Sequence, residues 1–102
     1  MEELCLFIKI KTTNGKRERV REIWEKYVKL RAIRNDQYLS YYYCFDSQDP
    51  NVIGIFERFE SNETMQKNVT ANWFISYMEE VYPYLDEPSE VNMLAPVWIK
   101  YT

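Results

Sequence analysis

The chain has 102 residues, a formal net charge of −3, two glycines and four prolines. This length fits one domain, and so few glycines and prolines are atypical of disordered or low-complexity chains. We therefore expect a single domain over residues 1–102. The two cysteines, Cys5 and Cys44, lack metal-ligand spacing, and the chain has no histidine to act with them. A metal site is not expected.

The N-terminal sequence MEELCLFIKIK has no basic region, and its apolar run is too short for a signal peptide or a membrane span. We expect a cytoplasmic protein with reduced cysteines and no membrane partner.

Charge is unevenly distributed along the chain. Residues 16–34 carry eight Lys or Arg and three Glu, a net charge of +5, which leaves −8 for the remainder. A basic helix can bind nucleic acid. The alternative is a solvated face with charge pairs such as Glu22–Lys26 and Glu25–Lys29. The acidic remainder favours the solvated face, so no nucleic-acid partner is expected.

The first half of the chain predicts a strand, a helix and a second strand. Residues 4–11 alternate as a strand, and Asn14-Gly15 supplies a turn. Residues 16–34 predict one helix, whose apolar stripe consists of Val20, Ile23, Trp24, Tyr27 and Leu30. Residues 38–45 predict a strand with Leu39, Tyr41, Tyr43 and Phe45 on one face and Tyr38, Ser40, Tyr42 and Cys44 on the other.

The second half predicts two strands and two helices. Residues 46–51 form a loop, and the strand at 52–59 places Glu57 on the face that carries Ile53, Ile55 and Phe59. Ser61 is the expected N-cap of a short helix over 62–69. A longer helix over 72–82 should be ended or kinked by Pro83, and a last strand over 90–99 carries Pro96 at an edge position or a bulge.

The predicted order is β-α-β-β-α-β, the α+β ferredoxin-like arrangement, whose helices cover one face of an antiparallel sheet. In its usual strand order the first two strands are not neighbours, so Cys5 and Cys44 should not pair. The two strands of the central hairpin, over 38–45 and 52–59, are apolar or aromatic on both faces, whereas an exposed sheet face would be polar. A second copy of the chain is the simplest cover, so we expect a homodimer built as an α+β barrel.

Several stretches together resemble the antibiotic biosynthesis monooxygenase domain family of dimeric α+β-barrel proteins, which includes small quinol monooxygenases. They are Asn-Gly-Lys before an amphipathic helix, YLSYYYCFDSQDPN, FERFESNETMQKN and EPSEVNMLAPVW. The resemblance covers nearly the whole chain. It implies a homodimer with a pocket in each monomer and, in members without a cofactor, oxidation of a small aromatic or quinol-like molecule by dioxygen.

The resemblance also implies site residues. Glu57 and Phe59 match the family's strand glutamate and the aromatic after it, and Phe74 matches another aromatic. Asn68 and Trp73 stand where many members have histidines. Haem-degrading relatives need a histidine ligand, so the chain is expected to use neither haem nor another cofactor.

Each candidate residue has two interpretations. Glu57 is either a general base or a structural acid paired with a Lys or Arg of the same chain or of the other subunit of the dimer. Asn68 and Asn72 either hydrogen-bond the substrate or cap helices. Phe59 and Trp73 are pocket walls or core, and Tyr77 is a pocket phenol or core. The Tyr41–Tyr43 run is assigned to packing and the dimer interface.

Three functions follow from these interpretations. The first is a cofactor-independent monooxygenase with Glu57 and Asn68 as catalytic residues and Phe59, Asn72, Trp73 and Tyr77 as substrate contacts. The second is a non-catalytic dimer that binds a small molecule. The third is a nucleic-acid or protein adaptor that uses the basic helix.

Overall fold

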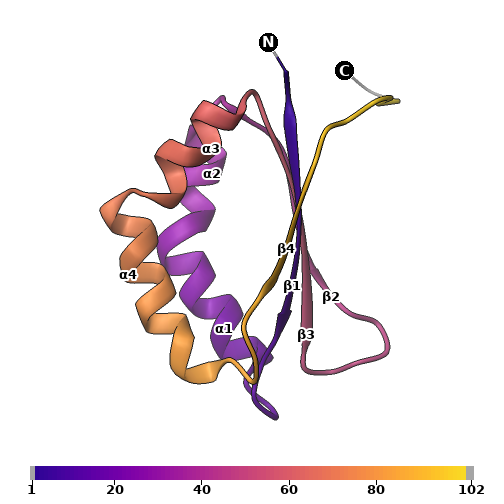
Figure 1. The fold of residues 1–102 in the computed structure, drawn as a ribbon. Helices are drawn as coiled ribbons and strands as arrows, with labels where there is room; N and C mark the ends of the chain where they lie inside the picture. The colour runs from indigo at the N-terminus through magenta and orange to yellow at the C-terminus, as the bar shows by residue number, and fades with distance from the viewer. Residues whose placement is uncertain (1, 101–102) are drawn as a thin grey trace.

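A computed structural model describes residues 2–100 as a four-stranded antiparallel sheet with helices on one face (Figure 1). The strands are β1 (Leu4–Lys11), β2 (Tyr38–Phe45), β3 (Val52–Phe59) and β4 (Glu90–Leu94), in the spatial order β2-β3-β1-β4. The expected α+β ferredoxin-like fold is confirmed. The first two strands are not neighbours, and both cysteines are free.

The helices follow the expected positions with small differences. The predicted helix over 16–34 is one continuous segment, α1 (Arg17–Trp24), the π-helical η1 (Glu25–Lys29) and α2 (Leu30–Arg34). Next come α3 (Asn62–Val69), α4 (Asn72–Val81) and a 3₁₀ turn, η2 (Tyr82–Tyr84). The longer helix therefore ends one residue before the predicted Tyr82, because the chain tightens into the turn that contains Pro83.

The π-helical turn changes which residues of the first helix reach the core. Val20, Ile23 and Trp24 are buried as predicted, but Leu30 is 57% exposed and Val28 is buried in its place. A π-helical turn contains more residues than an α-helical turn, so it rotates the following residues around the helix axis. A uniform helical period could not show this shift.

The basic residues of this helix mostly have partners. Lys29 pairs with Glu25 at 3.5 Å, as expected. The predicted Glu22–Lys26 pair is wrong, because Lys26 reaches Glu80 on α4 at 3.0 Å, which ties the two helices together. Arg17 donates to three backbone carbonyl oxygens around the β2–β3 hairpin. The positive charge thus serves helix packing and loop closure.

A β-bulge in β2 changes the face of one tyrosine. The register with β3 pairs Tyr38 with Phe59 and Ser40 with Arg58, so Leu39 is the extra residue. Tyr38 therefore lies on the same face as Tyr41, and not with Ser40 and Tyr42 as the strict alternation predicted. This face is the one that the helices cover, and its strand positions include Glu57.

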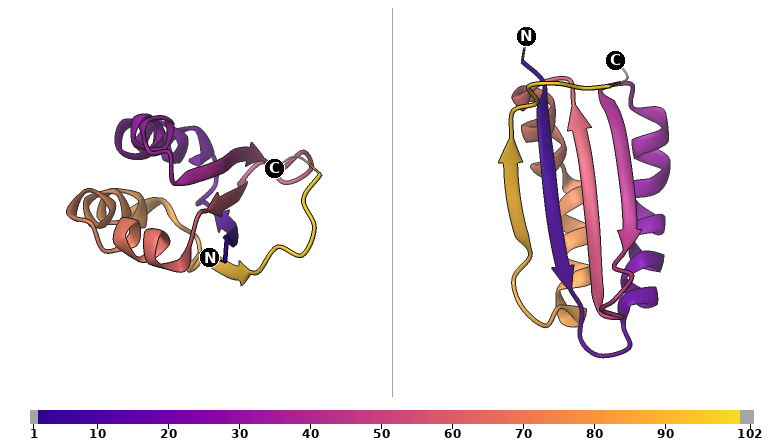
Figure 2. Two further views of the ribbon diagram at one scale, coloured as in Figure 1. Left: turned by 90° about the horizontal axis from the view of Figure 1, so that it is seen from above. Right: turned by 90° about the vertical axis from the view of Figure 1, so that its right-hand side faces the viewer.

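The last strand is shorter than predicted. It ends at Leu94, and residues 95–100 leave the sheet and cross its open face near the start of β1 (Figure 2). Pro96, which cannot donate a ladder hydrogen bond, lies in this departing segment. Trp98 of the segment is 79% exposed.

The open face of the sheet faces the viewer in the right-hand view of Figure 2. Aromatic side chains lie on this face. Phe7 and Phe56 meet edge to face at 4.7 Å, and Tyr42 contacts Phe56 at 5.8 Å. Phe7, Tyr42 and Leu94 are all more than 40% exposed. Within residues 2–100, no helix is long and apolar enough to cross a membrane.

The N-cap of α3 fixes where the chain turns from β3 into the helical layer. The Ser61 Oγ accepts from the backbone N–H of Thr64 at 3.2 Å, and both side chains are buried.

We expect Ser61→Ala to lower the free energy of unfolding by about 1 kcal/mol, because it removes this cap. Urea denaturation measures the loss. Ser47→Ala, in the exposed hairpin loop, is the control and should change stability little; equal effects of the two substitutions would contradict the cap's role.

Candidate functional site

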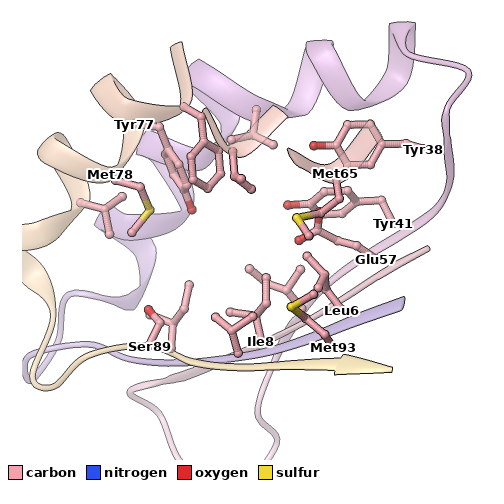
Figure 3. A pocket seen from close by; sticks show the side chains of 17 residues that line it. Leu6, Ile8, Tyr38, Tyr41, Glu57, Met65, Tyr77, Met78, Ser89 and Met93 are labelled. Atoms are coloured by element: carbon pink, nitrogen blue, oxygen red, sulfur yellow. The ribbon is translucent and has the colours of Figure 1, made fainter. Parts of the chain in front are cut away.

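A cavity of about 250 Å³ lies between the sheet and the helical layer. Its lining comes from β1, β2, β3 and β4 on one side and from η1, α3 and α4 on the other (Figure 3). Almost all of the 17 lining side chains are apolar or aromatic. Such a cavity, with a small number of polar groups, is the usual form of a small-molecule site.

Among residues 2–100, Glu57 is the one charged side chain in the lining. It is 6% exposed, and strand pairing places it between Leu6 of β1 and Tyr41 of β2. No hydrogen bond or ion pair within residues 2–100 reaches its carboxyl group. Burial raises the pKa of Glu57 from 4.5 to about 7, because the apolar surroundings disfavour the charged form.

This geometry bears on the two interpretations of Glu57. A structural acid would be expected to have a basic partner, and no Lys or Arg side chain in the described residues pairs with it. A carboxyl group with a pKa near neutrality can accept and return a proton under ordinary conditions. The structure therefore provides the environment that a general base needs.

Besides Ser89, three tyrosines supply polar groups to the cavity: Tyr38, Tyr41 and Tyr77. Figure 3 shows their hydroxyl groups and the carboxyl group of Glu57 directed into the cavity. Burial, and then the negative charge of Glu57, raises the pKa of each hydroxyl. All three hydroxyls therefore stay protonated near neutral pH and can donate hydrogen bonds.

Tyr41 is held by a specific contact. The indole Nε1–H of Trp24 donates a hydrogen bond of 2.9 Å to the Tyr41 hydroxyl oxygen. The Trp24 ring also stacks on Tyr43 at 4.2 Å, which fixes the indole from the other side. Trp24 thus sets the position of a cavity hydroxyl without itself lining the cavity.

Exposed apolar side chains mark the approach to the cavity between α4 and β4. Met78 is 37% exposed, Val91 54% and Met93 56%, and all three line the cavity (Figure 3). Ser89, in the loop before β4, adds a hydroxyl at the same side. An apolar ligand could pass this entrance without losing contact with apolar surface.

Two of the six predicted site residues, Glu57 and Tyr77, line this cavity. Phe59 lies behind it: the ring is 1% exposed, packs with Leu6 and Met65, and contacts the Tyr38 ring at 4.6 Å. Phe59 therefore supports a lining residue and is not itself a wall.

The other three predicted residues lie outside the cavity lining. Asn68 donates its side-chain amide to the Thr64 carbonyl at 2.9 Å, one turn back in α3. Trp73 packs under the Arg31 guanidinium at 4.8 Å and, with Asn68, borders a separate shallow hollow beside α2. Asn72 is exposed at the first position of α4, whose N-cap is Ala71.

The sequence interpretation missed Tyr38 and Tyr41 as cavity residues. Tyr41 could have been found, because β2 and β3 are joined by a hairpin and alternation places Tyr41 and Glu57 on inward-facing positions. Tyr38 could not, because the bulge at Leu39 has no distinctive sequence signal. In residues 2–100, no three Cys, Asp or Glu side chains gather where they could hold a metal ion.

The raised pKa of Glu57 has a consequence for stability. Between pH 4.5 and about 7 the folded protein binds the Glu57 proton more tightly than the unfolded chain, so stability falls as pH rises through this window. We expect Glu57→Gln to be close to wild type at about pH 5 and more stable at about pH 8, by on the order of 3 kcal/mol.

Urea denaturation of both proteins at the two pH values measures this difference. Glu79→Gln, at an exposed position of α4, is the matched control and should show no such change with pH. A stability difference between Glu57→Gln and wild type that is the same at both pH values would contradict the unpaired, buried carboxyl group.

Comparison with known proteins gives a match in structure alone. No protein-family model matches the chain, and no curated protein matches its sequence. Solved structures match over nearly the whole chain. A proposed antibiotic biosynthesis monooxygenase from Chloroflexus aurantiacus is 22% identical, with a TM-score of 0.79 and 94% of each chain covered.

Two further structures carry the same description. The protein from Caulobacter crescentus has a TM-score of 0.87, and that from Nitrosomonas europaea has a TM-score of 0.86. Each is 11% identical, with 95% of this chain and 92% of the other covered. At these identities the similarity establishes the fold. The chain therefore has the ferredoxin-like fold of proteins described as antibiotic biosynthesis monooxygenases.

Proposed function

We propose that the protein is a cofactor-independent monooxygenase that oxidises a small phenolic or quinol-like aromatic molecule with dioxygen. The observation that carries this proposal is the unpaired carboxyl group of Glu57 at the polar end of an apolar, aromatic cavity. The descriptions of three proteins with the same fold support it.

The cavity has a suitable size and lining for such a molecule. A protein cavity of about 150 Å³ can hold benzene, so about 250 Å³ leaves room for a second fused ring. Phe74 and the three tyrosine rings offer faces and edges against which a flat ring can pack. The apolar walls also keep water away from a reactive intermediate.

The chemistry needs no metal or flavin, because the substrate supplies the electrons. Glu57 takes the proton of the substrate hydroxyl, and the phenolate gives one electron to dioxygen. The resulting radical and superoxide join at a ring carbon, and the Glu57 proton converts the peroxide to a hydroperoxide. Glu57 then takes the proton from that carbon as the O–O bond breaks. The departing hydroxide regains this proton, so one oxygen atom enters a quinone and the other leaves as water.

We also propose that the protein acts as a homodimer joined through the open face of the sheet. Phe7, Tyr42 and Leu94 are exposed there, and the segment 95–100 adds the exposed Val97 and Trp98. A contiguous apolar patch of this kind is typical of an interface. Pairing of two such faces would bury these side chains and leave each cavity on the helical side.

The monooxygenase proposal is tested by oxygen uptake with a panel of hydroquinones, anthrones and catechols. Protein-free samples correct for autoxidation. We expect protein-dependent uptake with at least one compound, and a fall of about a hundredfold or more in Glu57→Gln, because the variant cannot take the substrate proton.

Two control variants sharpen this test. Glu79→Gln and Asn68→Ala lie outside the cavity and should keep uptake near the wild-type rate. No uptake, while the same compounds raise the melting temperature, would overturn catalysis in favour of a non-catalytic binding dimer. Uptake unchanged in Glu57→Gln would remove Glu57 from the chemistry.

The dimer is tested by light scattering at micromolar concentration. We expect a mass about twice the 12.5 kDa of one chain. Tyr42→Lys should shift the mass toward the monomer, because it places a charge in the proposed interface. Ile33→Lys is the matched control, since Ile33 is similarly exposed on the helical side, 68% against 59%. A wild-type monomer would contradict the dimer.

A further inference from the structure

Building on the proposed function, we propose that the polar end of the cavity recognises one neutral hydroxyl group of the ligand, with Glu57 as hydrogen-bond acceptor and Tyr41 as hydrogen-bond donor. Trp24 is the positioning residue that fixes the direction of the Tyr41 hydroxyl. The ligand class is therefore a hydroxylated aromatic molecule, and aromatic carboxylates are excluded.

The direction of the Tyr41 hydroxyl follows from the chemistry of its partner. An indole N–H can only donate, so the Tyr41 oxygen is the acceptor in the 2.9 Å bond from Trp24. The Tyr41 proton must therefore be directed away from Trp24. No acceptor within residues 2–100 takes that proton, and Tyr41 lines the cavity. The hydroxyl is available to donate to a ligand.

Glu57 supplies the complementary half of the site. Glu57 and Tyr41 are cross-strand partners of β3 and β2, so their side chains leave the sheet at adjacent positions on one face. Figure 3 shows both polar ends in the same part of the cavity. A ligand hydroxyl placed there can donate to the carboxylate and accept from the phenol. A bare ring satisfies neither group.

The charge of the site explains the exclusion of anions. In the part of the lining that the structure describes there is no Lys or Arg, and Glu57 is the one charged group. A ligand carboxylate would bring a second negative charge into an apolar space without a counter-ion, which is costly. A neutral hydroxyl avoids this cost, and transfer of its proton to Glu57 moves the negative charge without adding another.

Equilibrium binding of three probes tests the proposal: 2-naphthol, naphthalene and 2-naphthoate. The titrations are done without oxygen at about pH 8. At this pH 2-naphthol is neutral, and the carboxyl groups of Glu57 and of 2-naphthoate are ionised. We expect 2-naphthol to bind at least about tenfold more tightly than naphthalene, because a hydrogen bond to a charged group adds that much affinity. We expect no measurable binding of 2-naphthoate.

Variants assign the recognition to the named residues. Tyr41→Phe should weaken the binding of 2-naphthol by about fivefold and leave the binding of naphthalene unchanged. Tyr43→Phe is the control, because Tyr43 lies on the same strand and also packs on Trp24 but does not line the cavity. Glu57→Gln should weaken the binding of 2-naphthol. It should also allow 2-naphthoate to bind, because the negative charge of Glu57 that repels it is gone.

Trp24→Phe tests the positioning role of Trp24. The readout is the ratio of the affinities for 2-naphthol and naphthalene, which a loss of stability alone would not change. The preference for 2-naphthol over naphthalene should fall, whereas Trp73→Phe, outside the cavity lining, should keep it. Equal affinity of wild type for 2-naphthol and naphthalene, tight binding of 2-naphthoate, or a preference unchanged in Tyr41→Phe would overturn the proposal. Because these titrations measure binding without turnover, a failure of this proposal can be distinguished from a failure of the proposed monooxygenase activity.

Discussion

The central physical constraint in this protein is a carboxyl group that is buried without a partner. Glu57 sits in the middle strand pair of the sheet, where the helices remove it from water and no basic side chain of residues 2–100 compensates it. An unpaired buried acid is unfavourable for folding when ionised. This cost is characteristic of catalytic acids and bases, because the apolar environment that destabilises the charged form also raises the pKa toward neutrality.

The rest of the fold supports this arrangement. The strand pairing places Leu6 and Tyr41 on either side of Glu57, and the bulge in β2 turns Tyr38 to the same face. The π-helical turn brings Val28 to the cavity. The bond from Trp24 then fixes Tyr41. Irregularities in strand and helix therefore serve the cavity, in keeping with the frequent occurrence of bulges and π-helical turns at functional sites.

The regular part of the fold could be predicted from the sequence. Alternation and helical spacing gave the strands over 4–11, 38–45 and 52–59, and Ser61 gave the start of α3, because each signal is local. The burial of Glu57 followed from its place in an apolar strand. The shortened last strand escaped prediction, because its departure from the sheet at Leu94 depends on tertiary pairing.

The site was harder to predict than the fold. The resemblance points to Asn68 and Trp73, and the amide side chain points to Asn72, yet helix orientation places all three outside the cavity lining. Tyr41 was assigned to packing, because a run of three tyrosines does not reveal which one meets an indole N–H. A hydrogen bond between residues 17 positions apart, and the void beside it, appear only in three dimensions.

Titration of the Glu57 carboxyl group itself distinguishes an unpaired, buried carboxyl group from an ordinary one. Carbon-13 NMR of protein labelled at the glutamate carboxyl carbon, with Glu57→Gln to assign the resonance, follows its protonation. We expect one resonance that titrates near pH 7 and is missing from the variant. Titration of that resonance near 4.5, the ordinary value for glutamate, would show a solvated or paired carboxylate and would contradict the account.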